Sequence, residues 1–258
     1  MGKNAVVLAR LHMYAVLPRL VEVAGFDEEA KKLIRQTSGV VKFSVFRTGS
    51  VELIFGAGSL EALRGTAHST DAGLWFSTPE ALNAMFQKGK FIPVPFGKPW
   101  HFGKLMTFQK LADRLEHYLG NPEKTLADSG DDPRIKEFLV RCMMYTAVYG
   151  IREVAEADPK MSWLAKGTRD GKFLMKVMPD GPQAHVIVRG GKFIPGKGSI
   201  DEPSATLEIA DLDTAWQMMQ GKLNLMGALG TGQIKVTGFI PLADNLGAAM
   251  DRLGTYLQ

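Results

Sequence analysis

Apolar residues in the second half of the chain follow helical and extended spacings in turn. From Pro133 to about Asp158 they fall on one side of a helix, and Asp132-Pro133 is typical of an N-cap followed by proline in the first turn. Two apolar runs around Pro179-Asp180-Gly181 predict a hairpin. The further predicted elements are a strand at 205–209, a helix from about 211 to 221, a strand at 233–237 and a helix at 241–257.

The first half shows the same order of predicted elements. Strands at 40–46 and 51–55 flank the turn Thr48-Gly49, and a strand at 74–76 follows. A helix over 79–87 has Thr78 or Ser77 as its N-cap, and a last helix runs from about 105 to 119. Each half therefore predicts antiparallel strands, a helix, one more strand and a terminal helix.

Short sequence matches between the halves indicate an internal duplication. Asp113-Arg114-Leu115-Glu116-His117-Tyr118-Leu119 shares five of seven positions with the segment 138 residues later, Asp251 to Leu257. Leu74, Phe76, Met85, Phe86 and Gln87 lie 133 residues before Leu207, Ile209, Met218, Met219 and Gln220. The offset between the copies increases from 133 to 138 residues, which predicts about five extra residues in the second copy. We place them in the glycine-rich stretch 227–238.

These patterns predict an α+β chain of two domains, residues 1–121 and 131–258, separated by a polar, turn-rich segment. Each domain is expected to have one mainly antiparallel sheet covered on one face by helices. A sheet covered by only a few helices favours a cavity between the two layers, although periodicity alone does not establish one.

Composition narrows the class of protein. Of 258 residues, 45% are apolar and 22% are charged, which excludes disordered, collagen-like and coiled-coil chains. The net charge of +4 is too small to indicate a nucleic-acid partner, and the excess lies in residues 1–120. A single cysteine, Cys142, excludes an intrachain disulfide and a cysteine-based zinc site, so we expect a reducing, cytoplasmic environment.

No run of apolar residues is long enough to predict a membrane-spanning helix or a secretory leader. The amino-terminal segment has the basic residues Lys3, Arg10 and Arg19 before its first acid, Glu22, among several apolar side chains. Two interpretations stay open. We favour a core helix with solvated charges, and the alternative is transient contact with an anionic membrane surface.

The residues that usually carry catalysis are not arranged for it. The five histidines, at 12, 68, 101, 117 and 185, show no spacing typical of metal ligands. Gly58-Ser59-Leu60 lacks the second glycine of a nucleophile elbow, and Gly198 stands where a phosphate-binding loop needs a hydroxyl, so 191–198 is interpreted as a glycine-rich turn. We therefore expect no catalytic residue, no metal site and no cofactor.

Methionine is abundant, with thirteen residues that gather on predicted helices. For a single methionine, ordinary core filling is the better explanation. Trp216, Met219, Leu225, Met226, Leu229 and Phe239 bracket a glycine-rich stretch, and there a pliable apolar rim that admits a water-insoluble ligand is an equally good explanation.

The second half resembles the type-2 sterol carrier proteins. The resemblance rests on Ala205-Thr206-Leu207-Glu208-Ile209, the 211–220 helix, Gly221-Lys222-Leu223, Gly232-Gln233-Ile234-Lys235-Val236-Thr237-Gly238 and the helix to Tyr256. It covers residues 133–258 and reaches the first half only through the repeat. It implies a five-stranded sheet around an apolar tunnel that holds a sterol, a fatty acid or acyl-coenzyme A. The tunnel lining that it implies is Trp216, Met219, Leu225, Met226, Leu229, Ile234, Val236, Phe239, Leu246 and Met250.

The first half departs from this pattern. Pro93, Pro95 and Pro99 stand where the second half has its last strand, and they do not permit a regular central strand. If this half has a pocket, we expect it to be built from aromatic residues, namely Phe86, Phe91, Phe96, Trp100 and Phe102. The first half alternatively serves only as a partner domain.

The leading hypothesis is a non-catalytic protein that binds and transfers an apolar small molecule. The alternative is an accessory protein that presents a lipidic intermediate to a partner biosynthetic enzyme. A third hypothesis, an enzyme for an apolar substrate using His101 or His185, has no arranged acid, base or nucleophile to support it.

Overall fold

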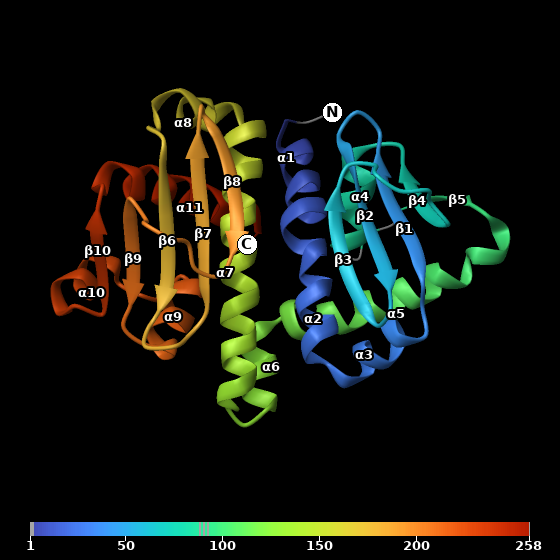
Figure 1. The fold of residues 1–258 in the computed structure, drawn as a ribbon, viewed down its shortest axis with the longest axis horizontal. Coiled ribbons are helices and arrows are strands. Elements are labelled where there is room, and N and C mark those ends of the chain that lie inside the picture. Colours follow the sequence, from blue (N-terminus) through green and yellow to red (C-terminus); the bar gives the residue numbers. More distant parts are fainter. Residues whose placement is uncertain (1–2, 88, 90, 92, 258) are drawn as a thin grey trace. The chain divides into compact units, whose positions relative to one another are not determined.

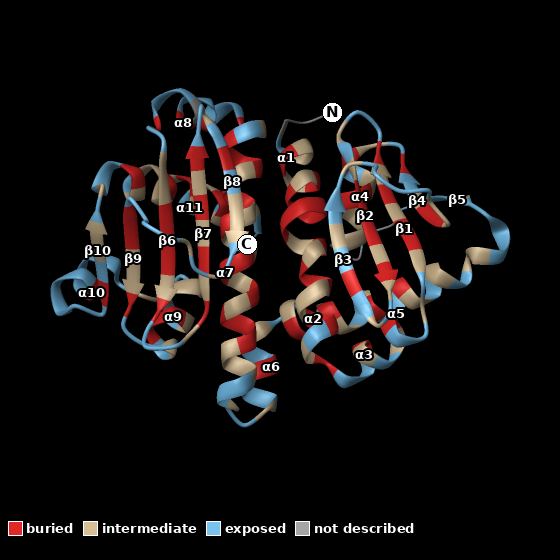
Figure 2. Cartoon of the chain, viewed as in Figure 1, coloured by how far each residue is buried: buried red, intermediate tan, exposed pale blue. Residues whose placement is uncertain are grey.

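A computed structural model describes residues 3–87, 89, 91 and 93–257. The chain divides into two compact units, Met1–Pro122 and Glu123–Gln258. Each unit is an α+β structure with one five-stranded mixed sheet (Figure 1). Buried residues concentrate on the strands and on the helices that pack against them (Figure 2).

In the first unit, the chain forms helices, then a sheet, then a long closing helix. The closing helix α5 packs on the sheet, where the rings of Phe43 and Phe108 lie 4.5 Å apart. The elements are α1 (Lys3–Leu11), η1 (His12–Val16), η2 (Leu17–Arg19), α2 (Leu20–Phe26), α3 (Glu28–Arg35), β1 (Gly39–Val45), β2 (Gly49–Gly56), β3 (Ser59–Arg64), β4 (Ala72–Phe76), α4 (Pro79–Phe86), β5 (Val94–Gly97), η3 (Pro99–His101) and α5 (Gly103–Leu119).

The second unit begins with α6 (Pro122–Asp128) and has its own long helix before the sheet. The predicted cap of that helix is confirmed, because the Asp132 carboxylate accepts from the Arg134 N–H at 2.8 Å. The elements are α7 (Pro133–Ala157), η4 (Pro159–Met161), α8 (Ser162–Gly167), β6 (Gly171–Val177), β7 (Gln183–Arg189), β8 (Lys192–Lys197), β9 (Ala205–Ile209), α9 (Leu212–Met219), α10 (Leu225–Thr231), β10 (Ile234–Gly238) and α11 (Ile240–Leu257).

The two sheets have the same strand order and the same pairings. The orders are β3-β2-β1-β4-β5 and, read in the same sense, β8-β7-β6-β9-β10. In each sheet the first strand pairs in parallel with the fourth, and the other three pairings are antiparallel. Ala72 and Ala205, 133 residues apart, hold equivalent register positions. Helices α4 and α9 lie at the same offset, capped by Thr78 and Asp211.

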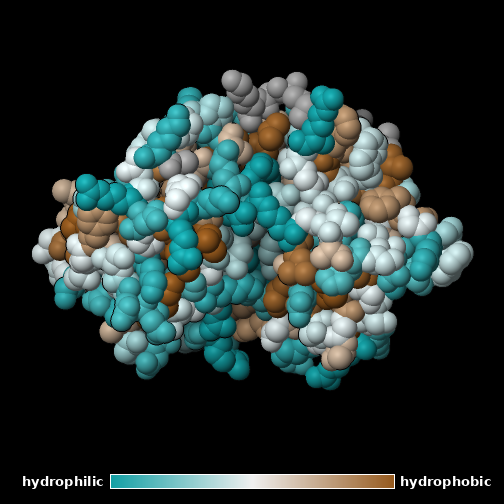
Figure 3. Space-filling view, turned by 45° about the horizontal axis from the view of Figure 1, so that its top comes forward, coloured by the Kyte–Doolittle hydropathy of each residue, from teal (hydrophilic) through white to brown (hydrophobic). Residues whose placement is uncertain are grey.

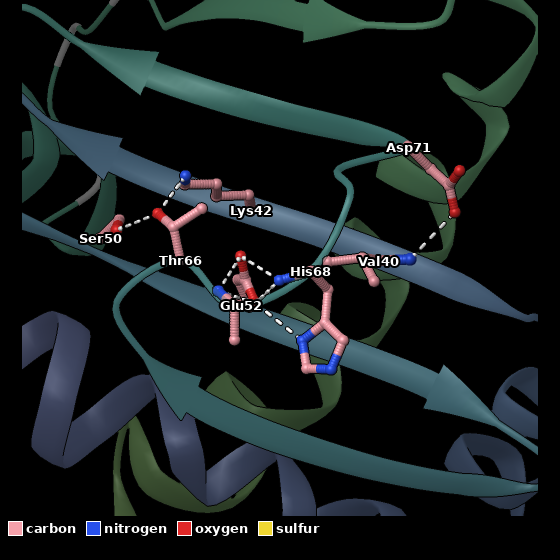
Figure 4. A network of polar contacts seen from close by, with 8 residues as sticks. Val40, Lys42, Ser50, Glu52, Thr66, His68 and Asp71 are labelled. Carbon is pink, nitrogen blue, oxygen red and sulfur yellow. Dashed lines mark hydrogen bonds and ion pairs between the residues drawn. The ribbon is translucent and has the colours of Figure 1, made fainter.

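One face of each sheet packs against helices, and we call the other the outer face. In the first unit the segment from Thr66 to Asp71 crosses the outer face between β3 and β4 (Figure 4). The fully buried Glu52 carboxylate accepts from the N–H groups of Ala67 and His68 at 3.2 Å, and the His68 ring lies 3.1 Å away. In the second unit, His185 Nδ1 lies 3.0 Å from the Gly198 carbonyl oxygen. These contacts hold the crossing segments against the sheets.

The third strand of each sheet, β3 and β8, was not predicted. The expectation of a turn over 191–198 is wrong, because residues 192–197 form the edge strand β8. The last strand of the first sheet, β5, contains Pro95. The proline is tolerated because β5 lies at the sheet edge. The extra length of the second unit includes a helix, α10, whereas the described residues between α4 and β5 of the first unit form no helix.

The amino-terminal segment is a core element. Residues 11 to 15 are all buried, and the Arg19 side chain is fully buried beside Glu22, with 3.4 Å between Nη1 and Oε2. Arg19 is therefore not available to a membrane surface. The favoured interpretation of this segment as a core helix agrees with the structure, except that the charge of Arg19 is not solvated.

Two glycines terminate the last strand of each sheet in the same way. Gly97 and Gly238 have φ angles of +109° and +84°, and a Cβ atom on either would lie 2.4 Å or 2.2 Å from the carbonyl oxygen of Asp71 or Ser204. Both positions therefore require glycine for conformation and for space.

Gly238→Ala is expected to destabilise the chain by about 1–3 kcal/mol more than Gly232→Ala. The two glycines have similar φ angles, +84° and +78°, but a Cβ on Gly232 meets no atom within 4 Å. Urea denaturation of the two variants measures the difference, and equal losses of stability would show that the close approach to Ser204 does not matter.

Candidate functional site

A cluster of aspartate, arginine and tyrosine ties the closing helix of each unit to an earlier segment. In the second unit, Asp158 accepts from Arg252 Nε, from the Tyr256 hydroxyl at 2.9 Å and from the Lys160 N–H at 2.9 Å. In the first unit, Asp27 accepts from Arg114 Nε at 3.1 Å and from the Tyr118 hydroxyl at 2.9 Å. The repeated sequence match contributes the arginine and the tyrosine of this cluster. The aspartate that accepts from them comes from an earlier segment and was not predicted from the sequence.

Electrostatics fix the protonation states in this cluster. Burial opposes ionisation of Asp158, but hydrogen bonds from Arg252, the Lys160 N–H and Tyr256 outweigh it and lower the pKa of the carboxyl. Burial and the hydrogen bond to Asp158 raise the pKa of Tyr256. The ionised aspartate, the protonated tyrosine and the arginine together form a structural clamp.

The expected ligand-binding residues of the second unit divide into an inner and an outer set. In the inner set, Ile234 and Leu246 are buried, and the remaining side chains are half-buried; these are Trp216, Met219, Val236, Phe239 and Met250. The sheet register places Val236 beside Leu207 and Ile234 beside Ile209 on the helix-covered face. Helix α11 packs on β9 and β10 over this face, and α9 packs on β9.

Most side chains of the inner set are only partly buried. Leu207 and Val236 occupy adjacent positions on the helix-covered face, yet both are only half-buried. The half-buried side chains of Trp216, Met219 and Met250 come from the helices that cover the same region. Apolar groups on a covered face are ordinarily sealed, so this incomplete burial is the geometric feature that an apolar ligand would complete.

The outer set lies on α10 and points to solvent. Leu225, Met226 and Leu229 are exposed, with Met226 at 79%, whereas Ala228 is buried. The Asn224 side chain caps the helix, and Gly232 ends it in a left-handed conformation. No charged residue occurs from Leu223 to Ile234. The sequence predicted these residues in a loop, and the structure instead gives a short, uncharged helix beside β10.

In the first unit, the region equivalent to the inner set is occupied by a bonded polar cluster. At the offset of 133, Asn83 and Phe86 replace Trp216 and Met219. The His12 ring stacks on Phe86 with centroids 4.2 Å apart, and its Nδ1 lies 3.0 Å from Asn83 Oδ1. Because the Asn83 amide donates to the Ala5 carbonyl, its oxygen faces His12, and the imidazole proton lies on Nδ1. Burial lowers the pKa of His12 to about 4, and the Asn83 contact offsets this only in part.

The expected aromatic pocket of the first unit is not assembled. Phe86 belongs to the cluster with His12, whereas Phe96 covers Gly73 on the outer face of the sheet. Trp100 is 77% exposed, Phe91 is exposed, and Phe102 is half-buried before α5. The prediction that these five residues line one pocket is wrong, because β5 directs Phe96 away from the helix-covered face.

Among the described residues, no group of three or more His, Cys, Asp or Glu side chains is placed to hold a metal ion. Within the same residues, no helix has the length and apolar character needed to cross a membrane.

Comparisons with known proteins give solved structures only. No protein-family model and no curated protein matches the chain. The sterol carrier protein domain 2 of Helicoverpa armigera is similar over 44% of this chain and 89% of its own, with 23% identity and a TM-score of 0.33. A ubiquinone synthesis protein, UbiJ-SCP2, matches 41% of this chain and 94% of its own, with 12% identity and a TM-score of 0.32. A sec-alkylsulfatase from Pseudomonas sp. matches 59% of this chain and 28% of its own, with 14% identity and a TM-score of 0.25.

Asp158→Asn is expected to cost about 3 kcal/mol of stability near neutral pH, because Arg252 loses its buried counter-ion. The ionised Asp158 contributes its full stabilisation above the ordinary aspartate pKa of about 4 and loses it as pH falls through the lower folded pKa. The difference in the free energy of unfolding between wild type and variant should therefore become smaller below about pH 4. Urea denaturation across pH tests this, with the exposed neighbour variant Asp251→Asn as control.

His12 should make the chain less stable in mild acid. Its pKa falls from 6.5 to about 4 in the fold, so the unfolded chain takes up a proton first, and stability declines between these values as pH falls. His12→Gln should flatten this part of the stability profile, while His117→Gln, at an exposed position, should leave it unchanged. A profile of unchanged slope in His12→Gln would contradict the assigned protonation state.

Proposed function

We propose that the chain is a non-catalytic lipid-binding protein that holds an apolar molecule in its second unit. The observation that carries this proposal is the incomplete burial of the inner set. Leu207 and Val236 lie on the helix-covered side of the sheet, and the residues of the inner set on the covering helices are also only half-buried. A sterol, a fatty acid or acyl-coenzyme A supplies the missing apolar contacts, and each buried methylene contributes about 0.8 kcal/mol.

Helix α10 is the proposed entrance. It packs beside β10 at the sheet edge, carries no charge and exposes Leu225, Met226 and Leu229. These side chains offer an apolar path from the surface to the inner set. A glycine-bounded helix of seven residues can move without breaking the sheet, because its own backbone bonds are local.

We also infer that the two units are copies of one domain and that their roles have separated. The strand order, the clamp and the strand-ending glycines recur in both units. In the first unit, however, His12, Asn83 and Phe86 occupy the region that we propose as the ligand site of the second. One chain is therefore expected to hold one apolar ligand.

The proposal is tested by native mass spectrometry of the purified chain, followed by organic extraction. A co-purified fatty acid, sterol or other lipid at one equivalent is the expected result. Two equivalents would contradict the assignment of the first unit. An empty protein that also ignores added lipid would favour the accessory role, in which the chain docks on a biosynthetic enzyme.

Met219→Glu is expected to weaken binding of a fluorescent fatty acid at least about tenfold, because a carboxylate must be desolvated among apolar groups. Ile194→Glu is the matched control, since Ile194 is an exposed apolar residue on the outer face of β8. Titration of both variants with the same fluorescent fatty acid measures the two affinities. Equal affinities would place the ligand elsewhere.

A further inference from the structure

The outer faces of the two sheets can be compared position by position, because the registers are the same. In the second unit, Lys176, Glu208 and Lys235 lie side by side across β6, β9 and β10. Lys176 Nζ is 2.8 Å from the Glu208 carboxylate, and this hydrogen bond lowers the pKa of Glu208. The next row consists of Leu174, Thr206 and Thr237. The first of these rows is thus charged, whereas Leu174 and Thr206 of the next row are buried.

Three of the six equivalent positions in the first unit carry large apolar side chains. Ser44, Trp75 and Val94 replace the charged row, and Lys42, Gly73 and Phe96 replace the next one. Trp75 is 37% exposed and Val94 is 49% exposed. The Phe96 ring lies over Gly73, where a Cβ atom would come within 2.4 Å of it. The absence of a side chain at Gly73 thus makes room for an aromatic ring that packs flat against the sheet.

These side chains form one surface with Phe46, which follows β1. The Phe46 N–H donates to the Phe76 carbonyl at 3.0 Å and continues the sheet, which places its exposed ring beyond Ser44 on the outer face. We call Phe46, Trp75, Val94 and Phe96 the aromatic face. On the side of the molecule seen in Figure 3, hydrophobic residues reach the surface in several groups among polar ones. A cluster of exposed aromatic rings on a regular sheet indicates a surface that is covered in function.

The surroundings of the aromatic face are basic. Strands β1, β4 and β5 contain no aspartate or glutamate. Asp71, directly before β4, is the acidic residue nearest to that strand in the sequence, and its carboxylate is paired with Lys104 at 2.7 Å. Lys98, directly after β5, is exposed and makes no ion pair within the part of the chain that the structure describes, and the Arg47 guanidinium lies 5.1 Å from the Phe46 ring centre. Such a surface repels a second copy of itself and attracts an anionic one.

We propose that the aromatic face docks on an anionic lipid bilayer. Tryptophan binds at the level of the lipid headgroups because its ring is apolar and its N–H is polar, and phenylalanine buries its ring at the boundary between headgroups and acyl chains. Each basic residue near an anionic membrane adds about 1 kcal/mol of attraction. The docking surface lies on the first unit, outside the proposed ligand site, and it does not depend on the second unit binding a lipid.

The test is sedimentation of the full chain with phosphatidylcholine vesicles that contain or lack phosphatidylserine. Wild type should bind the anionic vesicles, bind more weakly as salt rises, and show a blue shift of tryptophan fluorescence. The double variant Trp75→Glu with Val94→Lys restores the residues found at the equivalent positions of the second sheet, which that fold accommodates. Its binding should be at least about tenfold weaker, because the surface loses its exposed apolar area while its net charge is unchanged.

Ile194→Glu is the control, with a comparably exposed apolar residue on the other sheet, and it should bind vesicles as wild type does. Circular dichroism of each variant establishes that it is folded. Equal binding by wild type and the double variant would overturn the proposal. So would a wild type that ignores anionic vesicles, whether because it binds an acidic protein or because it dimerises through this face. Neither result would affect the fatty-acid titration that tests the ligand site.

Discussion

The parallel pairing of the first and fourth strands is the constraint on which each unit depends. Parallel neighbours cannot be joined by a tight turn, so the chain must leave one edge of the sheet and return across it. In both units the return is the segment between the third and fourth strands, which crosses the outer face. Helices occupy the other face, and this division separates the proposed ligand site from the outer surface.

A segment that crosses a sheet without forming a strand needs partners for its backbone. In the first unit Glu52 supplies them, and its complete burial is tolerated because two N–H groups and the His68 ring surround the carboxylate. The second unit places His185 at the equivalent position and bonds to a carbonyl oxygen instead. The crossing segment thus follows the same backbone path in both units, although in one unit it donates to the sheet residue and in the other it accepts from it. The path is therefore more constrained than the identity of the residues that hold it.

Much of this architecture is visible in the sequence, for local reasons. The cap of the helix after β4 was narrowed to Thr78 or Ser77, because a cap needs only a polar side chain before a helix, and the structure identifies Thr78. The repeat of Arg114 and Tyr118 at Arg252 and Tyr256 was identifiable because the clamp fixes their spacing on a helix. Asp27 and Asp158 were missed, although each also caps a helical turn, because nothing local links them to a helix some ninety residues later.

The sequence could not predict which way the residues of β5 face. Side chains alternate along a strand, so a shift of one residue would exchange Pro95 for Phe96 on the helix-covered face. The register follows from Gly97, whose left-handed backbone ends the strand beside Ala72. The same uncertainty applied to α10, since its glycines are equally compatible with a loop. Site residues were therefore predicted best where they lie on long helices or beside a matched strand.

The comparison of the two sheets explains why a duplicated domain can take two roles. The helix-covered face must stay packed to fold, so the polar substitution of Asn83 for Trp216 is accommodated by its hydrogen bonds to His12 and to the Ala5 carbonyl. The outer face has no such requirement, and a charged row there costs nothing in packing. Exposed aromatic rings, by contrast, carry a risk of aggregation, and a sheet has no folding reason to keep them. Trp75 and Val94 therefore point to a surface that is used. On these inferences, the first unit has given up a ligand site and gained a docking face, while the second has kept the site and a solvated exterior.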